Sequence, residues 1–170
     1  MEDRCRLLHP RAAFFITTAD SDGKPNVMTC TWATPVSEEP PMLIVCIEKQ
    51  HHTAELIRRS GEFGISIPSD TMVEQLVLCG TLSGHKDDKF AKAGLKQLPA
   101  RYIKAPLIDD CIGWLECRVT DTVEAGECYA FVGKILSAAV DERFFQDGVW
   151  NAASRIPLHM KGGRMVYFSE

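Results

Sequence analysis

The residues best suited to chemistry end the segment 22–53, where Lys49-Gln50-His51-His52-Thr53 precedes a predicted helix. The start of a helix presents free backbone N–H groups and the positive end of the helix dipole. Basic and hydroxyl side chains beside such a start make a candidate phosphate-binding site, formed here by Lys49, His51, His52 and Thr53. The alternative interpretation is a helix cap flanked by two surface histidines.

The earlier part of the same segment is a strand with an unusual composition. Asp22-Gly23 followed by Lys24-Pro25 predicts a tight turn, because this pattern cannot continue a strand. Hydroxyl and thiol groups are too frequent after the turn for an ordinary core strand. The residues concerned are Asn26, Val27, Met28, Thr29, Cys30 and Thr31.

Composition limits the class of protein. With 170 residues, 45% apolar and 25% charged, the chain is expected to form one globular domain over residues 1–170. The net charge of −4 gives no reason to expect nucleic acid or a membrane surface as a partner. No apolar run has transmembrane length, and the first residues lack a signal-peptide core. The seven cysteines form no Cys-x-x-Cys pair, which favours reduced thiols in a cytoplasmic protein over disulfides or a metal site.

Residue alternation, turn residues and capping signals predict the elements that position these residues. Strands are expected at 12–18, 26–32, 42–47, 62–67, 107–124 and 129–140. Helices are expected at 52–59 and after Ser69 or Asp70, with a further helical turn at 87–93. The wholly apolar run 42–47 predicts a strand buried on both faces, and Pro40-Pro41 predicts a loop at 34–41.

The last third of the chain carries two weaker patterns. Residues 141–155 are expected to form a surface excursion that exposes Phe144, Phe145 and Trp150 unless a partner covers them. Residues 157–160 and 165–168 are expected to pair as a last hairpin about the turn Lys161-Gly162-Gly163. About seven strands joined mainly by short turns, with two helices between them, favour an antiparallel barrel with helices packed outside it.

Short motifs follow one another along nearly the whole chain. They are Phe15-Ile16-Thr17-Thr18, residues 23–35, Glu39-Pro40-Pro41, residues 52–57, Ser60-Gly61-Glu62-Phe63, Cys79-Gly80, Ser83-Gly84, Asp88-Lys89-Phe90, Ala105-Pro106-Leu107-Ile108, Leu115-Glu116-Cys117 and Gly162-Gly163. No single motif is specific, but their joint order and spacing is. In this order and spacing the chain resembles the flavin reductase-like FMN-binding split-barrel family, which includes flavoredoxins and small ferric reductases.

The resemblance implies a mainly β protein, a Greek-key split β-barrel with two or three peripheral helices, that pairs as a homodimer with one FMN per subunit. It implies that residues 26–31 lie along the flavin and that residues 49–53 receive its phosphate. Relatives often carry Arg where this chain has His51, and Lys49 is the expected source of the missing charge. Gly80, Ser83 and Lys89 are further expected cofactor contacts, with Lys89 considered for tuning of the flavin ring.

Two functions remain open at this point. The first is an FMN-dependent oxidoreductase that uses NADH or NADPH to reduce flavin, Fe(III) or another small acceptor. The second is a flavoredoxin-like electron carrier that is reduced by a protein partner. The sequence has no Gly-x-Gly-x-x-Gly dinucleotide motif, yet the family stacks nicotinamide on the flavin without one. Catalytic residues are not identified, and Cys30 is interpreted as a packing residue rather than a redox thiol.

Overall fold

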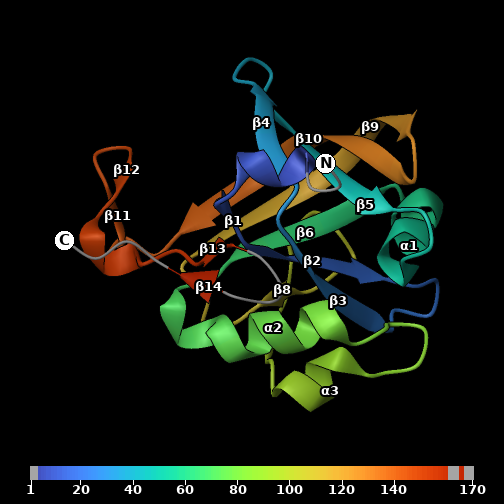
Figure 1. Ribbon diagram of the computed structural model, residues 1–170, viewed down its shortest axis with the longest axis horizontal. Helices are drawn as coiled ribbons and strands as arrows, with labels where there is room; N and C mark the ends of the chain where they lie inside the picture. Colours follow the sequence, from blue (N-terminus) through green and yellow to red (C-terminus); the bar gives the residue numbers. More distant parts are fainter. Residues whose placement is uncertain (1–3, 161–164, 167–170) are drawn as a thin grey trace.

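The centre of the computed structural model, which describes residues 4–160 and 165–166, is a seven-stranded sheet. Its strand order is β3-β2-β6-β9-β10-β5-β4, and every neighbouring pair is antiparallel. Figure 1 shows the hairpin of β9 and β10 crossing the middle of the molecule. The strands are β2 (Phe14–Ala19), β3 (Pro25–Cys30), β4 (Ala33–Ser37), β5 (Met42–Glu48), β6 (Glu62–Ile67), β9 (Gly113–Ala125) and β10 (Cys128–Val140).

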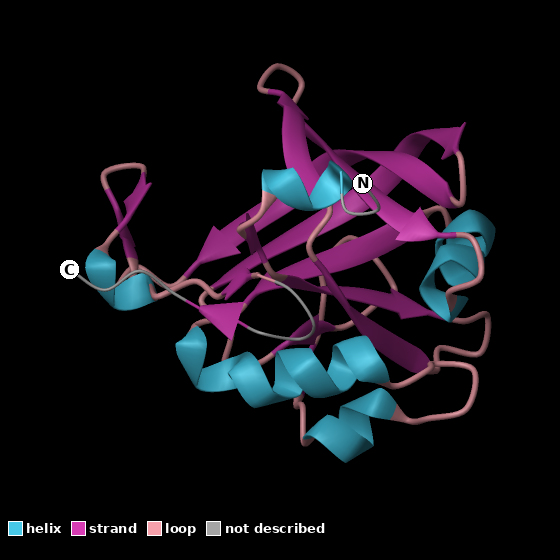
Figure 2. Cartoon of the chain, in the orientation of Figure 1, coloured by secondary structure: helices cyan, strands magenta, loops and turns pink. Residues whose placement is uncertain are grey.

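Three α-helices flank the sheet. In Figure 2, α2 (Val73–Thr81) and α3 (Lys89–Ala93) lie together on one side, and α1 (His52–Ser60) lies apart from them. Among the described residues, no helix has both the length and the apolar content that crossing a membrane requires. The short elements are η1 (Arg4–Leu8), β1 (Arg11–Ala12), η2 (Asp70–Met72), β7 (Gln97–Leu98), β8 (Leu107–Ile108), β11 (Phe145–Gln146), β12 (Val149–Trp150), η3 (Ala152–Ser154), β13 (Leu158–His159) and β14 (Met165–Val166).

Strand β2 separates two hydrophobic cores. Because side chains alternate along a strand, Ile16 joins a core that contains Phe63 and Phe131. Its neighbour Phe15 points to the other face and joins a core that contains Leu76 of α2 and Phe90 of α3. The two helices are therefore fixed against the part of the sheet that carries β2 and β3.

Most of the expected strands and helices are confirmed, and β6 occupies the predicted residues 62–67. The expectation of a loop at 34–41 is confirmed for 38–41, which form a turn. It is wrong for 34–37, because Ala33–Ser37 forms β4 and pairs with β5. Pro35 is tolerated there because β4 is an edge strand of the sheet. The pairing register also shifts between Pro35 and Ser37, as at a β-bulge.

Strand β5 was expected to be buried on both faces, but only one face is buried. Leu43, Val45 and Ile47 are buried, whereas Ile44 and Cys46, which alternate with them, are only half-buried. The prediction failed because a wholly apolar run is typical of two kinds of strand. One kind is covered on both faces, and the other has an apolar face that is partly exposed, as β5 has.

The excursion at 141–155 contains the hairpin of β11 and β12, which projects from one side of the molecule (Figure 1). Phe144, Phe145 and Trp150 are half-buried rather than exposed. The rings of Phe145 and Trp150 cover each other edge to face, with centroids 4.8 Å apart. In the last hairpin, β13 pairs with β14, whereas its expected turn at Gly162-Gly163 and its end at 167–168 lie outside the described residues.

Candidate functional site

A cavity of about 220 Å³ lies between the start of α1, the end of α2 and strand β3. It collects parts of the chain that are far apart in sequence. Its lining is Met28, Thr29, Gln50, His51, His52, Thr53, Cys79, Gly80, Thr81, Leu82, Ser83, Gly84 and Lys89.

The start of α1 forms one wall of the cavity. His51 is the N-cap residue, with an extended backbone and no side-chain hydrogen bond to the helix. The first-turn N–H groups, which a Ser, Thr, Asp or Asn cap would normally occupy, are therefore not satisfied by this side chain. The helix is otherwise well specified, since Gly61 ends it in the left-handed conformation with a φ of 70°.

Asn26 lies behind this wall and ties it to the sheet. Its side chain is 7% exposed, and its amide nitrogen donates to Thr18 Oγ1 (3.1 Å) and to Thr53 Oγ1 (2.9 Å). Both amide N–H groups thus have acceptors, as a buried polar group requires. Asn26 therefore positions Thr53 at the cavity, although it is not itself part of the lining.

Lys89 also lines the cavity and is only 5% exposed. Its Nζ donates a hydrogen bond of 3.1 Å to the carbonyl oxygen of Cys79. Asp88 holds the lysine in place by capping α3, since its carboxylate accepts from the N–H of Ala91 at 3.0 Å. Burial lowers the pKa of Lys89 from its ordinary value, because a charged ammonium is poorly solvated there.

The cavity favours an anion. No aspartate or glutamate of the described chain lines it, while the positive end of the α1 dipole and the Lys89 ammonium both adjoin it. His52 adds little charge by itself. Burial holds the pKa of His52 below its usual range, and the neighbouring His85 lowers it further.

Strand β3 supplies a second feature that suits a ligand. It is an edge strand, because β2 is its only partner in the seven-stranded sheet. The backbone groups on its other side are therefore not used by another strand of that sheet. Thr29 Oγ1 donates to the carbonyl oxygen of Leu76 at 2.6 Å, which holds α2 beside this edge.

The cavity brings together many of the residues singled out from the sequence. These are Met28, Thr29, His51, His52, Thr53, Gly80, Ser83 and Lys89. Thr31, a half-buried residue, follows β3 and lies outside the lining. Val27 and Cys30 belong to the hydrophobic cores, and burial raises the pKa of the Cys30 thiol to about 12.

Lys49 was expected at the phosphate site, but it does not line the cavity. Its Nζ lies 2.9 Å from a carboxylate oxygen of Glu124 on β9, and 5.3 Å from the centre of the Tyr129 ring. The lysine among the described lining residues is instead Lys89, which the motif Asp88-Lys89-Phe90 indicates for contact with the flavin ring.

Sequence reasoning did not single out several of the lining residues, namely Gln50, Cys79, Thr81, Leu82 and Gly84. Cys79 and Gly84 belong to the motifs Cys79-Gly80 and Ser83-Gly84 of the family resemblance, so these motifs could have indicated them as cavity residues. Gly84 is required by space, because a Cβ at this position would lie 2.3 Å from Asn26 Oδ1. Gln50 lies within the segment 49–53 that was expected to receive the phosphate, whereas Thr81 and Leu82 carry no local signal that distinguishes them from ordinary surface residues.

Comparison with known proteins gives a consistent result. The sequence matches the flavin reductase like domain over residues 6–167. A flavoredoxin of Desulfovibrio vulgaris (Miyazaki F) has a similar structure, with a TM-score of 0.86 and 29% identity over 95% of this chain and 88% of that one. The reductase component of a 4-nitrophenol 4-monooxygenase/4-nitrocatechol 2-monooxygenase from Rhodococcus opacus is 29% identical over 94% of this chain and 76% of its own.

The split-barrel fold expected from the sequence is confirmed. A split-barrel protein of Shewanella frigidimarina superposes with a TM-score of 0.88, covering 100% of this chain and 90% of that chain at 17% identity. At this identity the likeness concerns the fold alone.

Proposed function

Because the chain belongs to the flavin reductase-like domain family, we propose that it binds FMN in the cavity and uses it as an oxidoreductase. The observation that carries the proposal is the pair of positive features at one cavity. These are the start of α1, without a capping side chain, and the buried Lys89 ammonium. With no carboxylate in the described lining, this arrangement suits the phosphate of FMN.

Each part of the cofactor has a matching part of the chain. His51, His52 and Thr53 hold the phosphate, and Lys89 provides a countercharge. Met28 and Thr29 flank the ribityl chain, and the unpaired edge of β3 offers backbone hydrogen bonds to the flavin ring. When bound, FMN supplies reversible transfer of a hydride or of single electrons. The chain binds and orients it, and none of its own side chains is required as an acid or base.

NADH or NADPH is the proposed electron donor, and free flavin, Fe(III) or another small molecule the acceptor. The similarity to a monooxygenase reductase component supports this enzyme. The similarity to a flavoredoxin supports the second candidate, an electron carrier that a redox protein reduces. Both candidates use the same FMN site and differ in the donor.

We also propose that two copies of the chain form a homodimer. On the outer face of the sheet, Ile44 lies opposite Val132, and both are half-buried. Cys46, also half-buried, lies near Val123, because both pair with the buried Ala130 between them. Val123 is 51% exposed. A second copy would cover this apolar strip. Light scattering tests the proposal, and a mass that stays near 18.9 kDa at all concentrations contradicts it.

The first experiment asks whether the protein binds FMN. The purified protein is expected to be yellow, or to become so when FMN is added, with the two visible absorption bands of oxidised flavin. Titrations with FMN and riboflavin are compared, and FMN is expected to bind more tightly because only FMN has a phosphate. A protein that is colourless and binds neither flavin would contradict both candidate functions.

The second experiment separates the enzyme from the carrier. NADH or NADPH is added without oxygen to the FMN-loaded protein, and bleaching of the flavin is followed. Hydride transfer requires the donor carbon about 3–3.5 Å from the flavin, with the reacting atoms aligned. Bleaching within the time of mixing supports the enzyme. If only dithionite bleaches the flavin, the carrier is the better assignment.

A further inference from the structure

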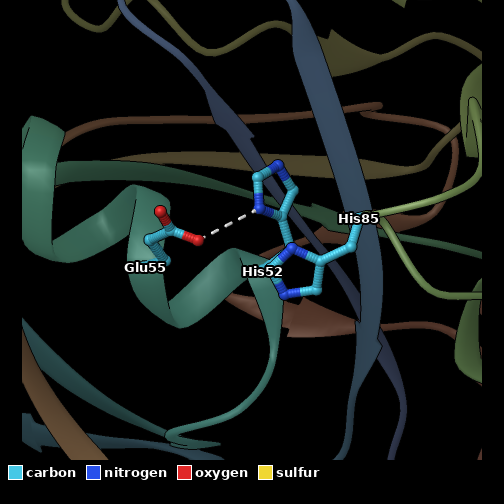
Figure 3. Close-up of side chains that lie close together, drawn as sticks. All are labelled: His52, Glu55 and His85. Atoms are coloured by element: carbon cyan, nitrogen blue, oxygen red, sulfur yellow. Dashed lines mark ion pairs between the residues drawn. The ribbon is translucent and has the colours of Figure 1, made fainter.

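Three side chains that can ligate metal ions gather beside the cavity (Figure 3). They are His52 and Glu55 of α1, together with His85 from the segment between α2 and α3. One ligand atom from each lies within 4.8 Å of those of the other two. The two imidazole rings have centroids 4.6 Å apart and are tilted by 51° rather than stacked.

Local structure explains how these residues meet. His52 and Glu55 are three positions apart on α1, so they lie on the same face of the helix. His85 reaches them because its neighbour Gly84 has no side chain. A Cβ on Gly84 would lie 3.2 Å from a ring carbon of His52, so a larger residue would hold the segment away from the helix.

We propose that His52, Glu55 and His85 form a binding site for a divalent transition-metal ion of the Zn²⁺ class. Two imidazoles and one carboxylate are a ligand set that Zn²⁺ accepts, with the fourth position left for water or another small ligand. Ligand atoms around a tetrahedral Zn²⁺ are about 3.3 Å apart, given bonds of about 2.0–2.2 Å. His52 Nδ1 and Glu55 Oε2 are already 3.6 Å apart, and the exposed His85 has room to complete the set.

The Nδ1 atom of His52 needs such a partner. It is buried and has no hydrogen bond within the described residues, since 3.6 Å to Glu55 is longer than a hydrogen bond. The carboxylate of Glu55 is therefore near enough to share a metal ion with this nitrogen but too far to accept a hydrogen bond from it.

Outer contacts orient the other two ligands. His85 Nε2 lies 3.4 Å from the carbonyl oxygen of Gln50. With the proton on Nε2, the lone pair is on Nδ1 and is available to a metal. Glu55 Oε1 is paired with Arg59 at 2.6 Å, which leaves Oε2 for the cluster. The three residues therefore have both the donor atoms and the supporting contacts of a metal site.

The test is a calorimetric titration of the full chain with Zn²⁺ in the absence of FMN, so that it does not depend on the proposed function. All proteins carry Cys5→Ser, because Cys5 is an exposed thiol that would itself bind Zn²⁺. The remaining cysteines are the same in every variant. His85→Ala and Glu55→Gln remove one ligand each, and His51→Ala removes a nearby imidazole that is not in the cluster.

The expected result is one Zn²⁺ per chain, with affinity at least ~10-fold weaker in His85→Ala and in Glu55→Gln. His51→Ala should bind Zn²⁺ like the parent. The proposal is overturned if the parent binds no Zn²⁺, or if its affinity is unchanged in both ligand variants. Circular dichroism of each variant confirms that it is folded.

Discussion

The side-chain amide of Asn26 donates a hydrogen bond of 2.9 Å to the hydroxyl oxygen of Thr53 and joins edge strand β3 to the first turn of α1. Both residues are buried. The two chain segments proposed to contact FMN are therefore parts of one rigid unit. A second amide bond, to Thr18 Oγ1, fixes Asn26 from the other side.

Thr53→Val is expected to weaken FMN binding by about 1–3 kcal/mol, since a hydroxyl that can donate to the phosphate is lost. It also leaves one N–H of Asn26 without its acceptor, which should lower the free energy of unfolding by about 1–3 kcal/mol. Thr18→Val is the matched control, because it removes the other acceptor away from the cavity lining. It should cost similar stability with a smaller effect on FMN. Fluorescence titration and urea unfolding measure the two quantities. Equal losses for FMN and riboflavin in Thr53→Val would show that Thr53 acts through folding only.

Gly84→Ala is expected to destabilise the protein by about 1–3 kcal/mol through overpacking, because the new Cβ would lie 2.3 Å from Asn26 Oδ1. Gly80→Ala is its counterpart, since its Cβ would make an ordinary contact of 3.5 Å with Thr29. Gly80 lies within α2, so alanine there should be neutral or stabilising by up to about 1 kcal/mol. Thermal unfolding of the two variants is compared. A stable Gly84→Ala would mean that the loop beside the cavity yields easily.

Lys89→Met is expected to change stability and FMN affinity in opposite directions. Burial lowers the pKa of Lys89 below its ordinary 10.5, so the charged lysine disfavours the folded state at neutral pH. This penalty is relieved as the pH rises through the folded-state pKa towards 10.5. The variant without FMN should therefore be more stable at neutral pH and should gain less stability in alkali. Its affinity for FMN, but not for riboflavin, should fall. Unfolding by urea at several pH values tests this, and a loss of stability would contradict it.

The parts of the fold that sequence patterns predicted are those with local signals. Strand β6 was bounded correctly because Gly61 ends the preceding helix and Pro68 stops the strand. Strand β4 was missed because Pro40-Pro41, which follow it, suggest a loop, and pairing with β5 is what makes 33–37 a strand. The strand propensity of a short segment does not predict such pairing with a distant strand.

The residues of the candidate site also fall into those with a local sequence signal and those placed by tertiary packing. Thr29, His52 and Thr53 could be found because each lies in a short segment with unusual composition. Lys49 is adjacent in sequence, but its ammonium is drawn to Glu124, 75 positions along the chain. His85 follows a glycine in an exposed segment, and its proximity to His52 depends on packing between α1 and the end of α2. Side-chain direction and loop packing depend on tertiary structure. The position of Lys49 and the proximity of His85 to His52 could therefore not be predicted from local sequence.

Acid is expected to destabilise the protein partly through His52. Burial lowers its folded-state pKa below the ordinary value of 6.5. The unfolded chain therefore binds more protons as the pH falls below 6.5, and stability falls with it. His52→Asn should lose less stability over the same range. Urea unfolding between neutral pH and about pH 5 measures the slope, and identical slopes in the two proteins would exclude His52 as a contributor.

Strand β4 also affects whether copies of the chain aggregate. An edge strand is a template on which other chains can add strands and begin to aggregate. Pro35 has no N–H to offer such a strand, and the irregular register between Pro35 and Ser37 interrupts the regular spacing of the backbone groups beside it. Pro35 thus protects the open edge of the sheet, and a chain carrying Pro35→Thr should form fibrils or precipitate more readily while its fold is unchanged.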